Sequence, residues 1–425
     1  MARNMKDSGI EWIGEIPEGW ELIKAKYLFS QRNEKGNSTL VLLSPTQKYG
    51  VIPQSQLEGV VQVKESTDLR AFKTIHIGDF VISLRSFQGG FEFSNYEGVC
   101  SPAYQVFHAT KDLSNDFFRY LFKSDGFISK INSLTVGIRE GKNIQYWDFS
   151  NMLLAVPPKE VQIRSAQYLN TQCTEIDTML SKTRSSIEEY KKLKQAVITQ
   201  AVTKGVRGER EMKDSEVEWI GEIPTSCSIC KLKYLLKNPL KYGANESGIP
   251  YSDSLPRYIR ITDITPDGNL KCTGKLSLSE ESAKDYILED GDILFARSGA
   301  TVGKTFIYYQ SYGRSAYAGY LIKASLNNKV SPKFVYYYTC SSLYEVWKNS
   351  IFIQSTIQNI GADRYANLPV PVPKTLQEQE EIADYLDAKC AEIDGLIAKK
   401  EQLVKELESY KKSLIYEVVT GKREV

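Results

Sequence analysis

The chain has 425 residues, of which 42% are hydrophobic and 25% charged, and its formal net charge is +2. This length predicts two or three domains with substantial cores, and no apolar run approaches the roughly 20 residues of a membrane span. The opening MARNMKDSGIEW lacks the apolar stretch of a secretory signal, and seven scattered cysteines favour a reducing compartment over a disulfide framework. We therefore expect a cytoplasmic protein in which any nucleic-acid-binding face is local.

The beginning of the chain is repeated near its middle. Residues 6–29 read KDSGIEWIGEIPEGWELIKAKYLF, and residues 213–236 read KDSEVEWIGEIPTSCSICKLKYLL, at an offset of 207. The identity is too dense to arise by chance, and the repeat unit is about half of the chain. This predicts an internal duplication rather than a solenoid of short repeats.

A variable body follows each opening, over about residues 30–150 and 237–362. Short apolar segments bounded by turn residues predict α/β bodies with many short strands: TIHIGDFVISLRS in the first, RYIRITDI and DGDILFARSG in the second. Each body closes with a proline-marked exit, AVPPK or PVPVPK, which stops a strand and prepares a helix start. The predicted division is 1–154 and 209–368 for the bodies with their openings, and 155–208 and 369–425 for two helical segments.

Both helical segments carry apolar residues at alternating spacings of three and four, the heptad pattern of a helix that packs lengthwise on another. Subtracting 217 from each seam position of the second helix gives a seam position of the first, and Leu407 corresponds in this way to Tyr190. Because the first helix leads from body one into body two, mutual packing requires an antiparallel coiled coil, a spacer with pseudo-twofold symmetry. Separate amphipathic helices on separate cores are the alternative. The predicted seam residues are Leu169, Cys173, Ile176, Leu180, Ile187, Leu386, Cys390, Ile393, Ile397, Val404 and Leu407.

In this order, the WIGEIP openings, the segment GDILFARSGATVGK, the run PVPVPKTLQEQEEIADYLDAKCAEIDGLI and the VVTGK tail resemble the specificity (S) subunits of type I restriction–modification enzymes. The first half departs from this pattern, with KEVQI in place of LQEQEEI. The resemblance implies an α+β fold in which two α/β target-recognition domains are separated by two long antiparallel helices. Each domain would read one half of a split DNA target.

The same resemblance implies the partners. The helices would set the gap between the half-sites and dock two methyltransferase (M) subunits, which supply S-adenosylmethionine and adenine N6 methylation. Restriction (R) subunits would supply translocation and cleavage driven by ATP and Mg²⁺. The chain itself would then be a non-catalytic subunit that holds no cofactor. Two non-identical bodies on a common frame suit an asymmetric, bipartite target.

Basic and amide side chains near expected loop tips are the candidates for DNA contact, because Arg and Lys bind phosphate or guanine edges and Gln or Asn can read adenine. A solvated surface residue is the alternative for each of them. The candidates are Arg85, Arg139, Lys142 and Asn143 in the first body, and Arg297, Lys304, Gln354, Gln358 and Arg364 in the second.

Two motifs imitate other sites. Three residues separate Gly299 from Gly303 where a phosphate-binding loop has four, and the strand-like TFIYY follows, so Lys304 on DNA phosphate is the better interpretation. Cys227 and Cys230 have the spacing of half a zinc site, but a second pair is missing and the chain has two histidines, so no metal is expected. With little material for acid–base catalysis, the competing function is a protein–protein scaffold with two binding modules on a coiled coil.

Overall fold

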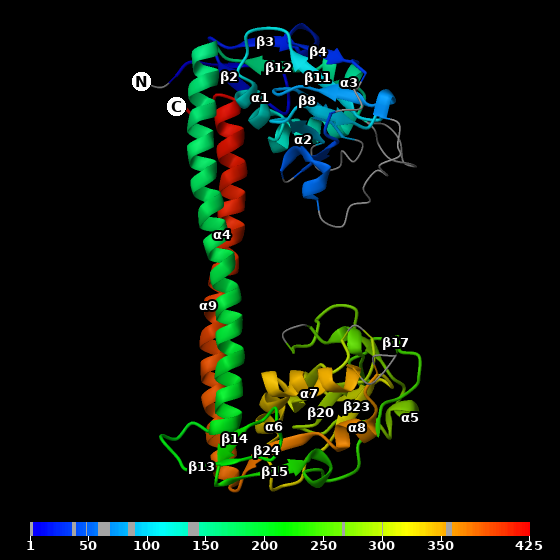
Figure 1. The fold of residues 1–425 in the computed structure, drawn as a ribbon. Coiled ribbons are helices and arrows are strands. Elements are labelled where there is room, and N and C mark those ends of the chain that lie inside the picture. Colours follow the sequence, from blue (N-terminus) through cyan, green and yellow to red (C-terminus); the bar gives the residue numbers. More distant parts are fainter. Residues whose placement is uncertain are drawn as a thin grey trace. The chain divides into compact units, whose positions relative to one another are not determined.

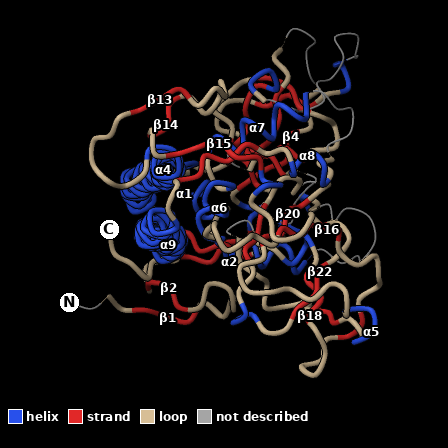
Figure 2. The backbone as a smooth tube through the Cα atoms, turned by 90° about the horizontal axis from the view of Figure 1, so that it is seen from below, coloured by secondary structure: helices blue, strands red, loops and turns tan. Residues whose placement is uncertain are grey.

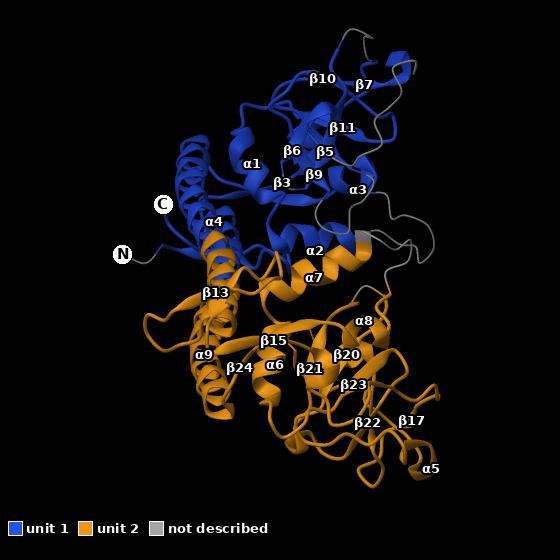
Figure 3. Cartoon of the chain, turned by 60° about the horizontal axis from the view of Figure 1, so that its bottom comes forward, with its two compact units in different colours: residues 1–184, 402–425 blue, residues 185–401 orange. Residues whose placement is uncertain are grey.

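The computed structural model describes residues 3–35, 40–47, 49–57, 69–83, 90–134, 144–265, 268–299, 301–353 and 359–425. These residues form two compact units, 1–184 with 402–425 and 185–401 (Figure 3). Each unit holds one body and one end of both long helices. This grouping differs from the predicted four-part division, which follows the chain and treats the helices as segments of their own; those bounds stay a prediction.

The first unit is built around a four-stranded antiparallel sheet of order β4-β11-β8-β9 (Figure 1). Strand pairs β1-β2, β3-β12, β5-β6 and β7-β10 surround it. The elements are β1 Met5–Asp7, β2 Glu15–Pro17, β3 Glu21–Lys24, β4 Phe29–Arg32, β5 Leu43–Thr46, β6 Gly50–Pro53, β7 Lys73–Ile75, β8 Phe80–Ile82, β9 Phe91–Phe93, β10 Gly98–Cys100, β11 Gln105–Ala109, α1 Asn115–Leu121, α2 Asp125–Leu134, α3 Tyr146–Ser150 and β12 Leu153–Val156.

The second unit repeats this plan and adds a second sheet. Its antiparallel sheet β16-β23-β20-β21 corresponds to β4-β11-β8-β9, while the sheet β17-β19-β18-β22 contains a parallel pair, β18 with β22. The elements are β13 Met212–Asp214, β14 Glu222–Pro224, β15 Cys227–Lys231, β16 Lys241–Tyr242, β17 Ile249–Pro250, β18 Arg257–Ile259, β19 Leu276–Ser277, α5 Glu280–Ala283, β20 Ile293–Ala296, β21 Thr305–Ile307, β22 Ser315–Tyr317, β23 Leu321–Ala324, α6 Pro332–Thr339, α7 Ser342–Ile353, α8 Ala362–Ala366 and β24 Pro369–Pro373.

The two cores differ in chemistry. In the first unit, Phe80, Phe91, Phe107 and Phe122 pack with ring centroids 5.1 to 6.0 Å apart, mostly in edge-to-face and tilted arrangements. The second unit uses tyrosine and tryptophan, whose buried polar atoms need partners. Its Tyr344 and Tyr365 hydroxyls donate to backbone carbonyls at 2.7 and 2.9 Å. The bodies therefore share a frame but not a core.

The long helices are α4, Lys159–Lys204, and α9, Leu376–Val419. As expected from the sequence, α4 begins directly after two prolines, and each helix is followed by a glycine with positive φ, Gly205 or Gly421. Figures 1 and 2 show the two helices side by side. They are antiparallel: in the first unit Asp177 pairs with Lys411 and Arg184 with Glu408, and in the second Lys194 pairs with Asp394 and Arg207 with Glu381.

The predicted seam residues lie between the helices or against the adjoining core. Eight of them are at most 7% exposed, while Ile397, Val404 and Leu407 are half-buried. In the first unit the residues Leu169 to Leu180 join one cluster with Leu414 and Val418, and the phenylalanine core is part of the same cluster. The helix ends are therefore continuous with the body cores rather than attached by flexible linkers.

Candidate nucleic-acid interface

Arg297 lies at the end of β20 in the second unit. Its backbone is held on both sides, because its N–H donates to the Tyr320 carbonyl at 3.0 Å and its carbonyl accepts from Ile360 N–H at 2.8 Å. Its half-buried guanidinium stacks over the ring of Tyr242, 4.9 Å from the centroid. The Nε atom is buried and has no hydrogen-bond partner among the described residues. The stack therefore holds the remaining N–H donors of the Arg297 guanidinium in a fixed plane.

Lys304 lies at the other end of the same hairpin. The Lys304 carbonyl accepts from Ala296 N–H at 2.8 Å, and its side chain is exposed. The hairpin joins β20 to β21, an antiparallel strand, so the glycines at 299 and 303 serve a turn and no helix N-terminus follows them. Both glycines have positive φ, which is the conformation that a tight turn of this kind requires.

Arg364 is brought close to Arg297 through Tyr242. The Tyr242 hydroxyl accepts a 3.0 Å hydrogen bond from the backbone N–H of Ala362, the first residue of α8, and α8 carries the exposed Arg364. Tyr320, which is 63% exposed, lies next to Arg297 through their backbone hydrogen bond. The structure thus gathers Arg297, Lys304 and Arg364 around one end of β20, together with two tyrosines that sequence reasoning missed because no spacing singles them out.

Six candidates from the sequence lie outside the described residues: Arg85, Arg139, Lys142, Asn143, Gln354 and Gln358. The hairpins of the two halves share one backbone hydrogen bond. Ser83 N–H donates to the Gly90 carbonyl at 2.7 Å, as Ala296 N–H donates to Lys304. Counting along the sequence from that bond, position 84 corresponds to Arg297.

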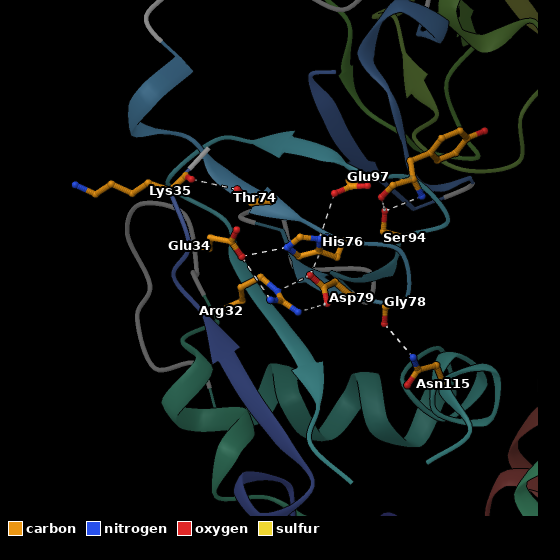
Figure 4. Close-up of polar contacts among 11 residues, drawn as sticks. Arg32, Glu34, Lys35, Thr74, His76, Gly78, Asp79, Ser94, Glu97 and Asn115 are labelled. Carbon is orange, nitrogen blue, oxygen red and sulfur yellow. Dashed lines mark hydrogen bonds and ion pairs between the residues drawn. The ribbon is translucent and has the colours of Figure 1, made fainter. Parts of the chain in front are cut away.

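In the first unit an ionic cluster surrounds Asp79, directly before β8 (Figure 4). Buried Asp79 accepts from the Arg32 Nε and Nη2 at 2.8 and 3.2 Å and from His76 N–H at 2.9 Å. The His76 ring lies between two carboxylates, 3.1 Å from Glu34 and 3.4 Å from Glu97. The hydrogen bond with His76 lowers the pKa of Glu34. Asp79 thereby fixes the turn that feeds β8.

The second half keeps the aspartate and changes its cation. Asp292 is buried and accepts from Glu289 N–H at 2.8 Å and from the Ser325 hydroxyl at 2.5 Å. Its cation is Lys323, 3.4 Å away on β23, whereas Arg32 lies on β4. The Gly-Asp pair visible in both sequences is therefore a structural turn shared by the bodies rather than a reactive site.

A buried glutamine fixes each body to its long helix. Gln162 accepts from Ser114 N–H at 2.9 Å and donates to the Pro157 carbonyl at 2.8 Å. In the second unit Gln379 accepts from Ser331 N–H at 2.8 Å and donates to the Pro373 carbonyl at 3.0 Å. Both serines cap the first body helix after the sheet, α1 or α6, and every partner is displaced by 217 or, at the proline, by 216 residues.

A tyrosine adds a second attachment in each unit. Tyr120 donates to Asn170 Oδ1 at 2.8 Å, and Tyr337 donates to Asp387 Oδ1 at 2.6 Å. Asp387 also accepts from Lys333 at 2.6 Å, which raises the pKa of that lysine. Both bodies are thus oriented on their helices by the same pair of polar contacts.

Within the described ranges, no three His, Cys, Asp or Glu side chains are grouped so as to hold a metal ion. No helix among them is long and apolar enough to cross a membrane. The polar groups of the site are cations, amides and tyrosines on turns, a set suited to binding an anionic polymer.

The sequence of the chain is similar to a protein family and to several known proteins. The family described as the type I restriction modification DNA specificity domain matches residues 212–406. The type I restriction enzyme MjaVIII specificity subunit of Methanocaldococcus jannaschii is 23% identical, covering 96% of this chain and 93% of its own. The putative MjaX specificity subunit of the same organism is 25% identical, covering 96% and 95%.

Two solved structures share the fold. A chain from a study of assembly and conformational transition in a type I R-M system has a TM-score of 0.74 at 15% identity, covering 96% of this chain and 99% of that one. The HsdS subunit from Thermoanaerobacter tengcongensis has a TM-score of 0.54 at 16% identity, covering 96% and 98%. These structures confirm the fold class expected from the sequence, and the family match and the named relatives confirm the resemblance.

Proposed function

We propose that this chain is the subunit that reads a bipartite, asymmetric DNA target, because residues 212–406 match the family described as the type I restriction modification DNA specificity domain. The observation that supports this proposal is that the two halves of the chain share some features and differ in others. Turns, caps and helix attachments repeat, while the cores, an added sheet and the hairpin residues differ. A common frame with two different bodies suits two different half-sites.

In the second body we assign the DNA contact to Arg297, Lys304 and Arg364. Arg297 is the candidate for a guanine edge, because Tyr242 holds its guanidinium in one plane and bidentate recognition needs a fixed plane. Lys304 and Arg364 are exposed cations near the same end of β20 and suit backbone phosphates. Arg85, Arg139, Lys142 and Asn143 are the corresponding proposals for the first body, with Gln354 and Gln358 in the second.

Catalysis and its cofactors belong to partners in this proposal. Two methyltransferase subunits bind S-adenosylmethionine, restriction subunits use ATP and Mg²⁺, and the complex works in the cytoplasm. The docking surface for the methyltransferase subunits includes apolar residues flanking the helix seam, such as Leu403, which is 41% exposed. In this proposal the chain itself supplies recognition of the DNA sequence and the helices on which the other subunits assemble.

Single-molecule sequencing of N6-methyladenine tests the proposal in cells that carry the chain with its methyltransferase subunit. We expect a split motif that appears only when the chain is present. Replacing residues 30–150 with the body of another specificity subunit should change one half of the motif and leave the other intact. An unchanged motif after the exchange, with the exchanged chain in complex, contradicts the proposal.

A further inference from the structure

Two short segments, 18–29 and 225–236, occupy the same place in the two halves. Each runs through the strand that pairs with the exit strand of its body, β3 with β12 or β15 with β24, and into a one-turn helix. At the offset of 207 they are identical at only four positions, one of which is a buried leucine. The other three positions are exposed, and we name them the lysine–tyrosine patch: Lys24, Lys26 and Tyr27 in the first half, and Lys231, Lys233 and Tyr234 in the second.

This pattern of identity is the reverse of what a purely structural segment shows. Buried positions differ between the copies: Trp20 is replaced by Cys227, and Ala25 by Leu232. Exposed Glu21 has also become Ser228. Because exposed side chains away from special contacts change with little effect on stability, three retained exposed positions indicate a contact with something outside the chain.

The geometry of the patch is retained as well. The ammonium of Lys26 lies 5.2 Å from the centroid of the Tyr27 ring, and the same distance separates Lys233 from Tyr234. The tyrosines are 60% and 68% exposed. None of the four lysines forms an ion pair with a carboxylate of the described residues, whereas lysines elsewhere in both units do. The positive charge of each patch is therefore available to a ligand.

In the second unit the patch adjoins the candidate interface. The one-turn helix that carries it, Leu232–Tyr234, contacts α8. Helix α8 carries Arg364, and its first N–H donates to Tyr242, on which Arg297 stacks. The one-turn helix of the patch and Arg297 are therefore linked through α8 and Tyr242 within the same unit.

We propose that each lysine–tyrosine patch binds the phosphate backbone of duplex DNA, independently of sequence, and anchors its body on the half-site. Lysine ammonium and tyrosine hydroxyl groups are ordinary phosphate contacts. The ligand must be common to both halves, although the bodies differ, and the backbone is what two different half-sites share. This inference rests on the proposed function. It adds to that function a contact that anchors each body on the DNA without reading bases.

The test uses the assembled complex of the chain with its methyltransferase subunit. Fluorescence anisotropy gives its affinity for a duplex containing the target and for a scrambled duplex over a range of KCl concentrations. Replacing both patch lysines of one half with alanine should weaken both affinities equally and lower the slope of log K against log salt by about 1 per lysine. Replacement of all four should double the change, and arginine at the same positions should restore the slope.

The matched control is Lys182→Ala with Lys405→Ala, which removes the same charge from exposed positions of the long helices. Its slope should equal that of the unaltered complex. An unchanged slope in the patch variants, with target-specific binding intact, overturns the patch assignment and leaves the proposed function standing. Loss of methyltransferase association by native mass spectrometry without a change in slope would instead assign the patch to protein docking. An unaltered complex that fails to prefer the target duplex overturns both.

Discussion

Lys411 Nζ lies 2.7 Å from each carboxylate oxygen of Asp177, and the second unit contains the counterpart of this ion pair. There Lys194 Nζ lies 2.8 and 2.6 Å from the oxygens of Asp394. Lys411 is the repeat of Lys194, and Asp394 is the repeat of Asp177, at the same offset of 217. Each unit therefore contains the same ion pair with the roles of the two helices exchanged, as an internal duplication with antiparallel helices predicts. Both lysines occupy positions where the heptad pattern expects an apolar residue.

Charge reversal at these positions should lower stability and be rescued by a matching reversal. Lys194→Glu with Lys411→Glu puts like charges on the seam, and adding Asp177→Lys and Asp394→Lys restores opposite charges. The pairs are partly exposed, so each contributes roughly 0.2–1 kcal/mol. A double-mutant cycle measures the coupling by thermal unfolding of the unaltered chain, the two-lysine variant, the two-aspartate variant and the variant with all four changes. Additive losses without rescue would show that the pairs do not set the helix register.

Removal of a buried glutamine should loosen one body on its helix. Gln379 is 1% exposed, and Gln379→Ala leaves Ser331 N–H and the Pro373 carbonyl without their partner. An unsatisfied buried group costs roughly 1–3 kcal/mol. Hydrogen exchange should rise in α6 of the second unit and stay unchanged in α1 of the first. Gln377→Ala, at an exposed position of the same helix, is the control; equal exchange in both variants contradicts the attachment role.

Acidic residues in the seam should disrupt the helix pair. Leu180 is 5% exposed and Ile397 half-buried, and a buried, unpaired carboxylate costs several kcal/mol. Leu180→Asp with Ile397→Asp should therefore abolish cooperative unfolding or sequence-specific methylation. Lys182→Asp with Lys399→Asp, at exposed positions, should leave both nearly unchanged. Normal thermal stability and an intact methylation motif in the first variant would show that these positions are not packed together with the seam.

Loss of the arginine platform should relax one half of the target. Tyr242→Ala removes the ring under Arg297, and Arg297→Lys removes the planar fork. A bidentate base contact discriminates by roughly 1–3 kcal/mol, so methylation in vitro should tolerate a substituted base pair in the half-site of the second body. Arg314→Lys, a change in a surface ion pair with Glu280, is the control. Equal discrimination in all variants would place the base contact elsewhere.

The stability of the first unit should fall on mild acidification. Burial, and secondly the charge of Arg32, lower the pKa of His108 below its ordinary value. The unfolded chain then takes up the proton first, so stability is fully present above the unfolded pKa of about 6.5 and is lost as the pH falls towards the folded pKa. His108→Gln should flatten this part of the pH profile of chemical unfolding. A profile that is the same in both proteins would assign the acid sensitivity to other groups.

Some of the candidate site could be foreseen, because its turns have local signatures. An exposed hairpin is predicted by Gly299, Gly303 and the basic residue directly before β21. That basic residue is Lys304. Arg297 was also found from its position at the end of an apolar strand. Tyr242 was not, because it is 55 positions away in the sequence and the stack exists only once β16 and β20 share a sheet.

The sequence by itself determined the duplication, the two long helices with their proline starts and glycine ends, and the seam pattern. These features depend on neighbours within a few residues or on direct comparison of the two halves. Tertiary structure decided which partners meet: Arg32 with Asp79 but Lys323 with Asp292, and Lys411 with Asp177 across the seam. The order of strands in the sheet and the register of the two helices bring these groups together. Neither can be predicted from the spacing of the paired residues in the sequence.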